Sequence, residues 1–171
     1  MIKNIIFDFD GVLVDSEILM LKSFRQYLSK RNIFINEKEF VNYAGNKTIN
    51  VVKELSYRLN IQDTQKFYND IMMIANKIYN NELTTVVGTK KFLYQINQQK
   101  FIASNSWKER IIQGLEKVNF YKFFKEKNIF SFDMVDLPKP EPDIYLKVIK
   151  SNNLCSEETI IIEDSVVGVQ A

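Results

Sequence analysis

Short apolar runs that each end in polar or acidic residues recur along the chain. The runs at 3–9 and 159–162 are rich in Ile and Phe, a further run of the same kind lies at 101–103, and a weaker one lies at 129–132. Compact apolar runs of this length are typical of strands buried on both faces of a parallel sheet. Each run therefore predicts one strand, and the polar residues that follow it mark the end of that strand.

Helical patterns separate these runs. They predict helices over 88–98, 108–118 and 142–151, and Pro142 suits the first turn of the last one. Strands that alternate with helices of this length indicate βαβ units. The pattern therefore predicts an α/β fold built on a parallel sheet.

The segment 18–83 breaks this alternation, because its apolar residues keep helical spacing almost throughout. We interpret it as a helical insertion of roughly 65 residues, about the size of a small domain. The predicted core then consists of 1–17 and 84–171. An insertion that leaves from the end of the first strand sits over the carboxyl ends of the strands. The apolar positions that define the helices are Ile18, Leu21, Phe24, Leu28, Val51, Val52, Leu55, Leu59, Phe67, Ile71, Ile74 and Ile78.

The charge and hydropathy of the sequence argue against two classes of binding partner. The 171 residues include 23 Lys and Arg and 21 Asp and Glu, so the formal net charge is +2. This near balance lacks the strongly basic footprint of a nucleic-acid-binding domain. No 18-residue window is free of charged residues, so the sequence predicts no membrane span. We therefore expect neither nucleic acid nor a membrane as a partner.

The use of cysteine and histidine restricts location and chemistry. A single cysteine, Cys155, permits no internal disulfide and favours a cytoplasmic location. Histidine is absent, which excludes Ser-His-Asp and Cys-His catalysis and every His-ligated zinc site. Any chemistry must therefore use carboxylates, hydroxyls, amines and a hard metal ion.

Acidic residues follow the first and the fourth apolar run. Asp8 and Asp10 stand at the end of the first, and Glu163 and Asp164 follow the fourth. In an open parallel sheet, ligands bind just beyond the carboxyl ends of the strands. Carboxylates held this close repel one another unless one is protonated or a cation sits between them, and an all-oxygen site suits Mg²⁺. Each pair alone is compatible with a solvated turn, whereas the combination favours a magnesium site.

Two further segments supply polar groups. Ser104 and Asn105 close the second strand ahead of a helix that begins near Trp107. A hydroxyl and main-chain N–H groups at a helix start can hold a phosphate, although Ser and Asn are also the commonest helix caps. Lys139 lies between Pro138 and Pro140, whose fixed φ angles make the loop stiff.

Taken in chain order, these motifs resemble those of the haloacid dehalogenase superfamily of phosphohydrolases and phosphomutases. The resemblance covers nearly the whole chain and is strongest to the β-phosphoglucomutase-like subgroup, which has a helical cap after the first motif. It implies a Rossmann-like core with 18–83 as the cap. Relatives continue beyond the Gly168 segment with another strand and helix. The segment 165–171 has the pattern of a helix start that is cut off, so we expect the C-terminal strand and helix to be missing here.

The resemblance also implies roles for the acids. Asp8 would be the nucleophile that becomes an aspartyl phosphate. Asp10 would be the general acid and base and would lend its carbonyl to Mg²⁺. Asp8, Glu163 and Asp164 would complete the metal site.

Other residues would bind the substrate. By the same resemblance, Ser104, the Asn105 amide and Lys139 would hold the transferring phosphoryl group, with Gly11 in the substrate-binding loop. Gly45 and Lys47 resemble the substrate-specificity loop of the cap. A substrate of this kind is a small phosphorylated metabolite, and we expect a monomer.

The leading hypothesis is a Mg²⁺-dependent phosphatase that acts on a sugar or sugar-acid phosphate. A phosphomutase uses the same nucleophile but needs a cationic seat for a second phosphate, for which Lys47, Lys53 and Arg58 are candidates. A truncated, catalytically silent relative is a third possibility. The run at 120–127 interleaves aromatic residues with lysines, as in single-strand nucleic-acid platforms, but packing between a helix and the third strand is the preferred interpretation.

Overall fold

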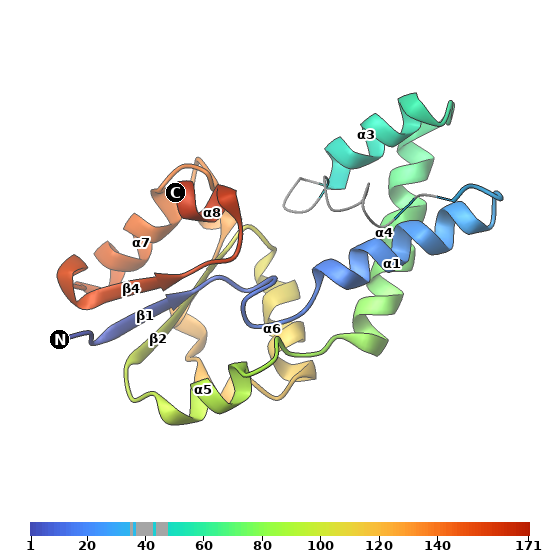
Figure 1. Cartoon of the computed structure of the whole chain (residues 1–171). Helices are drawn as coiled ribbons and strands as arrows, with labels where there is room; N and C mark the ends of the chain where they lie inside the picture. Colours follow the sequence, from blue (N-terminus) through green and yellow to red (C-terminus); the bar gives the residue numbers. More distant parts are fainter. Residues whose placement is uncertain (35, 37–42, 44–47) are drawn as a thin grey trace. The chain divides into compact units, whose positions relative to one another are not determined.

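The structure, a computed structural model of the chain, describes residues 1–34, 36, 43 and 48–171. It divides into two compact units. The first consists of Met1–Asp15 together with Leu83–Ala171, and the second is Ser16–Glu82. Figure 1 labels helices and strands of both units.

A parallel four-stranded sheet with the order β3-β2-β1-β4 forms the centre of the first unit (Figure 1). Its strands are β1 (Asn4–Phe7), β2 (Gln99–Ser104), β3 (Ile129–Ser131) and β4 (Thr159–Ile162). Phe7 at the end of β1 is in register with Ile102 on one side and Ile162 on the other. The polar residues that follow β1, β2 and β4 therefore emerge at one edge of the sheet. This arrangement confirms the predicted α/β class.

At β4 the sheet is not buried on both faces as the apolar run predicts, since Ile160 and Ile161 are 38% and 44% exposed. Helices flank the rest of the sheet. They are α5 (Thr89–Gln95), α6 (Lys108–Lys117), α7 (Asp143–Asn152) and α8 (Val166–Gln170), with short 3₁₀ turns at Tyr121–Phe123, Glu126–Asn128, Phe132–Met134 and Ser156–Glu158. Side chains alternate between the faces of a strand, so neighbouring residues of β1 contact different helices. Ile6 lies in a buried cluster with Ile144 and Val148 of α7. Phe7 instead contacts the rings of Phe92 in α5 and of Phe124. Helices α5 and α7 therefore pack on opposite faces.

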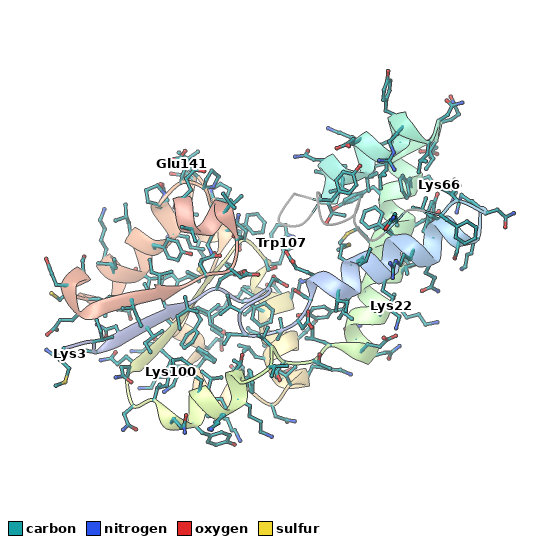
Figure 2. All side chains as sticks on the ribbon, viewed as in Figure 1. Lys3, Lys22, Lys66, Lys100, Trp107 and Glu141 are labelled. Atoms are coloured by element: carbon teal, nitrogen blue, oxygen red, sulfur yellow. The ribbon has the colours of Figure 1, made fainter. Side chains whose placement is uncertain are left out.

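The two ends of this sheet differ in chemistry. Lys3 and Lys100 lie at the amino ends of β1 and β2, whereas Trp107 lies beyond the carboxyl end of β2 (Figure 2). Trp107 precedes the first residue of α6, close to where the sequence predicts that helix to begin. The carboxyl end of the sheet is thus the edge at which loops lead into helices.

The second unit is helical throughout its described elements, α1 (Glu17–Ser29), α3 (Thr48–Arg58) and α4 (Thr64–Glu82). Its core contains Phe24 of α1, Leu55 of α3 and Phe67 of α4, all at most 1% exposed. The Phe67 ring contacts Phe24 edge-on and stacks on Tyr27. The apolar spacing of these helices is therefore explained by an internal core of this unit.

Among the described residues, no helix has the length and apolar character needed to cross a membrane.

Candidate active site

Acidic residues from two neighbouring strands converge at the carboxyl edge of the sheet. The backbone N–H of Asp8 donates to the carbonyl of Ile162 at 2.9 Å, which fixes the end of β1 beside the end of β4. Carboxylate oxygens of Asp8, Glu163 and Asp164 all lie within 4.8 Å of one another. The register of two parallel strands thus joins acids that are about 155 positions apart in the chain.

Lys139 lies between two of these acids. Its Nζ donates to Asp8 Oδ1 at 2.8 Å and to Glu163 Oε1 at 2.5 Å, and its side chain is 3% exposed. Burial disfavours the Lys139 ammonium, but the Asp8 charge and the hydrogen bonds to both acids outweigh burial, so the pKa of Lys139 is raised. The lysine therefore stays charged and acts as a fixed counter-ion.

Asp8 resists ionisation even with this lysine beside it. Burial raises the pKa of Asp8 to about 7, Lys139 opposes this rise, and the charges of Glu163 and Asp10 add to it. A cluster of carboxylate oxygens in which one acid resists ionisation is suited to a further cation. The donor set is all oxygen, which fits the ligand preference of Mg²⁺.

Glu163 accepts hydrogen bonds at both carboxylate oxygens. The N–H and Oγ of Ser165 each donate to Oε2 at 3.0 Å, while Tyr145 donates to Oε1 at 3.2 Å and shares that oxygen with Lys139. Burial acts against ionisation of Glu163, but the donors from Lys139 and Ser165 prevail, so its pKa is lowered. Glu163 therefore has two roles: it lies in the acidic cluster, and it holds Lys139 in place. The sequence did not indicate the second role.

Gly11 makes room for Asp164. A Cβ at Gly11 would lie 2.0 Å from Asp164 Oδ2, and the residue has a φ of +80°. The Gly11 N–H donates to the carbonyl of Val14 at 2.8 Å, which closes the turn after Asp10. The absence of a side chain is thus required both by the turn and by the neighbouring carboxylate.

The loop after β2 supports the lysine. Asn105 Nδ2 donates to the Lys139 carbonyl at 3.1 Å, and the Lys139 N–H donates to Asn105 Oδ1 at 3.1 Å. The Asn105 side chain thus fixes the backbone of the lysine loop. Ser104 is buried, and its Oγ accepts from the N–H of Ser106 at 3.2 Å.

The Asp10 carboxylate points toward α6. Ser106 Oγ donates to Asp10 Oδ2 at 2.5 Å, and Arg110 Nη2 lies 3.5 Å from Asp10 Oδ1. The sequence analysis did not single out Ser106, Arg110, Tyr145 or Ser165. Ser106 directly follows Ser104 and Asn105, and Ser165 directly follows Asp164, whereas no local pattern distinguishes Arg110 or Tyr145.

Gly45 and Lys47, predicted to form the specificity loop, lie outside the described residues. Lys53 and Arg58, the other candidate cations for a second phosphate, lie on α3 of the helical unit.

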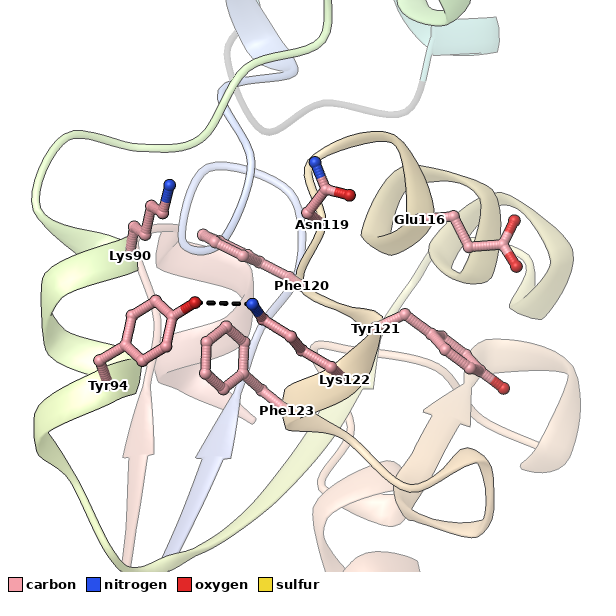
Figure 3. A pocket seen from close by; sticks show the side chains of 8 residues that line it. All are labelled: Lys90, Tyr94, Glu116, Asn119, Phe120, Tyr121, Lys122 and Phe123. Carbon is pink, nitrogen blue, oxygen red and sulfur yellow. Dashed lines mark hydrogen bonds between the residues drawn. The ribbon is translucent and has the colours of Figure 1, made fainter.

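An open groove of about 530 Å³ lies elsewhere on the first unit (Figure 3). Tyr94 of α5 faces Lys122 and Phe123 across it, and Lys122 Nζ donates to the Tyr94 hydroxyl at 2.6 Å. Phe120 is buried at its base, and Phe123 contacts the Tyr94 ring edge-on. Of the aromatic residues in the run at 120–127, Phe123 therefore packs against Tyr94 of α5, and Phe124 contacts Phe7 of β1.

Comparison with known proteins gives one family. Residues 5–171 match the family model described as haloacid dehalogenase-like hydrolase. A 6-phosphogluconate phosphatase of Escherichia coli K12 is 24% identical over 99% of this chain and 77% of its own length. A phosphorylated carbohydrates phosphatase of Thermotoga maritima is 25% identical over 99% of this chain and 79% of its own length.

Solved structures show the same fold. A conserved haloacid dehalogenase-like protein of unknown function from Agrobacterium tumefaciens superposes with a TM-score of 0.88 at 27% identity, covering 99% of this chain and 78% of that one. A putative β-phosphoglucomutase from Thermotoga maritima gives a TM-score of 0.82 at 24% identity, over 99% and 79% of the two chains.

Proposed function

We propose that this chain, which belongs to the haloacid dehalogenase-like hydrolase family, is a Mg²⁺-dependent phosphatase that hydrolyses a small phosphorylated metabolite. The proposal rests on one observation, the buried Lys139 ammonium held between Asp8 and Glu163 beside Asp164. A carboxylate, a fixed cation and a further acidic pair at one sheet edge are the groups that phosphoryl transfer needs for positioning and charge neutralisation.

Asp8 would act as the nucleophile. One of its carboxylate oxygens attacks phosphorus, the bond from phosphorus to the ester oxygen breaks, and an aspartyl phosphate forms. Lys139 lies next to Asp8 and would offset the like-charge repulsion between the carboxylate and the phosphate. Ser104 and the N–H of Asn105 would hold the other phosphoryl oxygens.

Asp10 would move the protons. Protonated Asp10 gives its proton to the departing alkoxide in the first step and, as a carboxylate, takes a proton from the water that attacks the aspartyl phosphate in the second. The sum of the two steps is hydrolysis of the ester, with Asp8 regenerated.

Asp8, Asp164, Glu163 and the Asp10 carbonyl would hold Mg²⁺. When bound, the ion supplies positive charge to the phosphoryl oxygens. Both oxygens of Glu163 already accept protein donors, so Glu163 has little remaining capacity for the ion.

The substrate class follows from the relatives. Relatives named for 6-phosphogluconate and for phosphorylated carbohydrates favour a sugar or sugar-acid phosphate, and others named pyrophosphatase make pyrophosphate a second candidate. We propose the helical unit as the cap that selects the substrate, with Gly11, Gly45 and Lys47 in the binding loops. A cytoplasmic enzyme acting on free metabolites fits this substrate class.

The test is phosphate release from p-nitrophenyl phosphate and from a panel of sugar phosphates, sugar-acid phosphates and pyrophosphate, with Mg²⁺ and with EDTA. We expect release that requires Mg²⁺ and is lost in Asp8→Asn. The matched control is Asp133→Asn, which changes an exposed acid of the same unit and should keep full activity.

Product analysis separates the alternatives. A phosphomutase converts a sugar 1-phosphate to its 6-phosphate with little phosphate release, so that result would replace the phosphatase proposal. A silent relative releases no phosphate from any member of the panel, which would refute enzymatic function.

A further inference from the structure

Two donors from the start of α6 hold the carboxylate of Asp10, one at each oxygen. Ser106 Oγ donates to Oδ2 at 2.5 Å, and Arg110 Nη2 lies 3.5 Å from Oδ1. The side chains of Arg110 and Asp10 are 26% and 27% exposed, so both are partly shielded from water. Ser106 lies two residues before α6 and Arg110 lies in its first turn, so both donors come from the junction between β2 and α6.

The backbone of Asp10 is held as well. Asp10 forms an isolated bridge with Val14, and the turn between them is closed by the Gly11 N–H. With the main chain fixed, the remaining freedom of Asp10 is rotation of its side chain. Ser106 and Arg110 act on that freedom, because each contacts a different oxygen.

We propose that Arg110, together with Ser106, is a positioning residue that orients the Asp10 carboxylate for proton transfer to the leaving group. This inference rests on the proposed function. Arg110 is suited to the task because its guanidinium lies beside the Asp10 carboxylate, whereas the ammonium of Lys139 is hydrogen-bonded to Asp8 and Glu163. Proton transfer requires the acid to be within hydrogen-bond reach of the ester oxygen, so loss of orientation lowers its rate.

A positioning role has a distinctive consequence. An alkyl phosphate releases a strongly basic alkoxide that needs the proton of Asp10, whereas p-nitrophenyl phosphate releases a weakly basic phenolate that needs it much less. The ratio kcat/KM reports the steps up to the departure of the leaving group, so a later step does not mask the effect. A substitution that disturbs only Asp10 must therefore slow the alkyl ester more than the aryl ester.

The experiment compares kcat/KM for a sugar phosphate and for p-nitrophenyl phosphate in the full chain with Mg²⁺. For Arg110→Gln we expect a fall of about 10-fold to 100-fold in kcat/KM on the sugar phosphate, which is less than the ~10²-fold to 10⁴-fold that acid catalysis as a whole contributes, because Asp10 itself remains. On the aryl ester we expect a fall of about 3-fold or less. Arg110→Lys, which keeps a cation on a flexible stem, should recover part of the loss. The inhibition constant of inorganic phosphate should change by a smaller factor than kcat/KM on the sugar phosphate, because Arg110 adds charge to the site but contacts Asp10 rather than phosphate.

Lys108→Gln is the matched control, because it removes a cation from the same helix. Lys108 pairs with Glu126 rather than with Asp10, so its variant should keep the wild-type ratio between the two esters. Ser106→Ala removes the donor to the other oxygen and should shift the ratio in the same direction as Arg110→Gln. It supplies the test if Arg110→Gln does not fold.

Other outcomes would overturn the inference. An equal fall on both esters would mean a general structural role, and a weakened inhibition constant with unchanged kcat would mean that Arg110 binds substrate directly. If kcat/KM of Arg110→Gln equals that of the wild type on both esters, the contact between Arg110 and Asp10 has no role in catalysis. Failure of the wild-type chain to hydrolyse either ester would instead defeat the proposed function, and this inference with it.

Discussion

Replacing Lys139 by methionine tests the electrostatic organisation of the site. The substitution keeps the length and most of the volume of the side chain but removes the charge that lies between Asp8 and Glu163. Lys139 is 3% exposed, so water cannot take the place of the ammonium without a rearrangement. We expect a loss of folding stability as well as of activity.

The magnitude follows from the two acids that lose their partner. Removing one member of a buried ion pair costs about 3–5 kcal/mol. Here the lower end applies, for two reasons. Asp8 has a pKa of about 7 and can take up a proton at little cost at neutral pH. Glu163 keeps its donors from Ser165 and Tyr145. We therefore expect a loss of about 3 kcal/mol in the free energy of unfolding.

The assay is urea denaturation without Mg²⁺, in which unfolding is monitored by a probe that reports on the unit that contains the sheet. Lys3→Met is the matched control, since Lys3 makes one ion pair, with Glu158, and its side chain is 64% exposed. An exposed pair of this kind contributes about 0–1 kcal/mol. The two lysine substitutions should thus differ several-fold in cost.

A second variant checks the cause. Adding Asp8→Asn to Lys139→Met removes one of the two uncompensated acids and should restore part of the stability. If Lys139→Met costs no more than Lys3→Met, or if Asp8→Asn makes the double variant less stable, the lysine does not neutralise these acids and the reasoning fails.

Three further predictions concern the same acids. Gly11→Ala should abolish Mg²⁺-dependent activity, because its Cβ would lie 2.0 Å from Asp164 Oδ2 at a φ of +80°; retained activity would contradict the assigned contact. Gly168→Ala should lower stability, because its Cβ would lie 1.7 Å from Glu163 Oε1; urea denaturation measures this, and an unchanged midpoint would contradict it. Without Mg²⁺, the unfolding free energy of the wild type relative to Asp8→Asn should fall as pH rises from about 4 to about 7. The reason is that folded Asp8 still holds a proton over this range, whereas Asp8 of the unfolded chain has released it. A difference in unfolding free energy that rises with pH would contradict the raised pKa of Asp8.

The sequence predicts the sheet well because strand ends are local features. Apolar runs that stop at polar residues locate β1 and β4 to within two residues, and the run at 101–103 is the centre of a longer β2. The strand order is a different matter. That β1 lies between β2 and β4 depends on pairing across the chain, which no local pattern specifies.

The sequence locates the acids but not the groups that orient them. Asp8 and Asp164 stand out because two acidic pairs follow two apolar runs. Arg110 and Tyr145 do not, since an arginine in a helix and a tyrosine in an apolar face are ordinary in both positions. Their roles depend on the tertiary contacts with Asp10 and Glu163, which only the structure shows.

Charge counting predicts the order in which metal and substrate bind. The carboxylates of Asp8, Asp10, Glu163 and Asp164 carry four negative charges when ionised, and Lys139 and Arg110 carry two positive charges, which leaves a net charge of −2. A phosphate dianion therefore meets repulsion until a divalent cation brings the site to neutrality. We expect inorganic phosphate to bind tightly only with Mg²⁺ present, as calorimetric titration measures. Asp164→Asn should lower the affinity for Mg²⁺ and the affinity for phosphate together. Phosphate affinity that is independent of Mg²⁺ would show that Lys139 and Arg110 alone offset the acids.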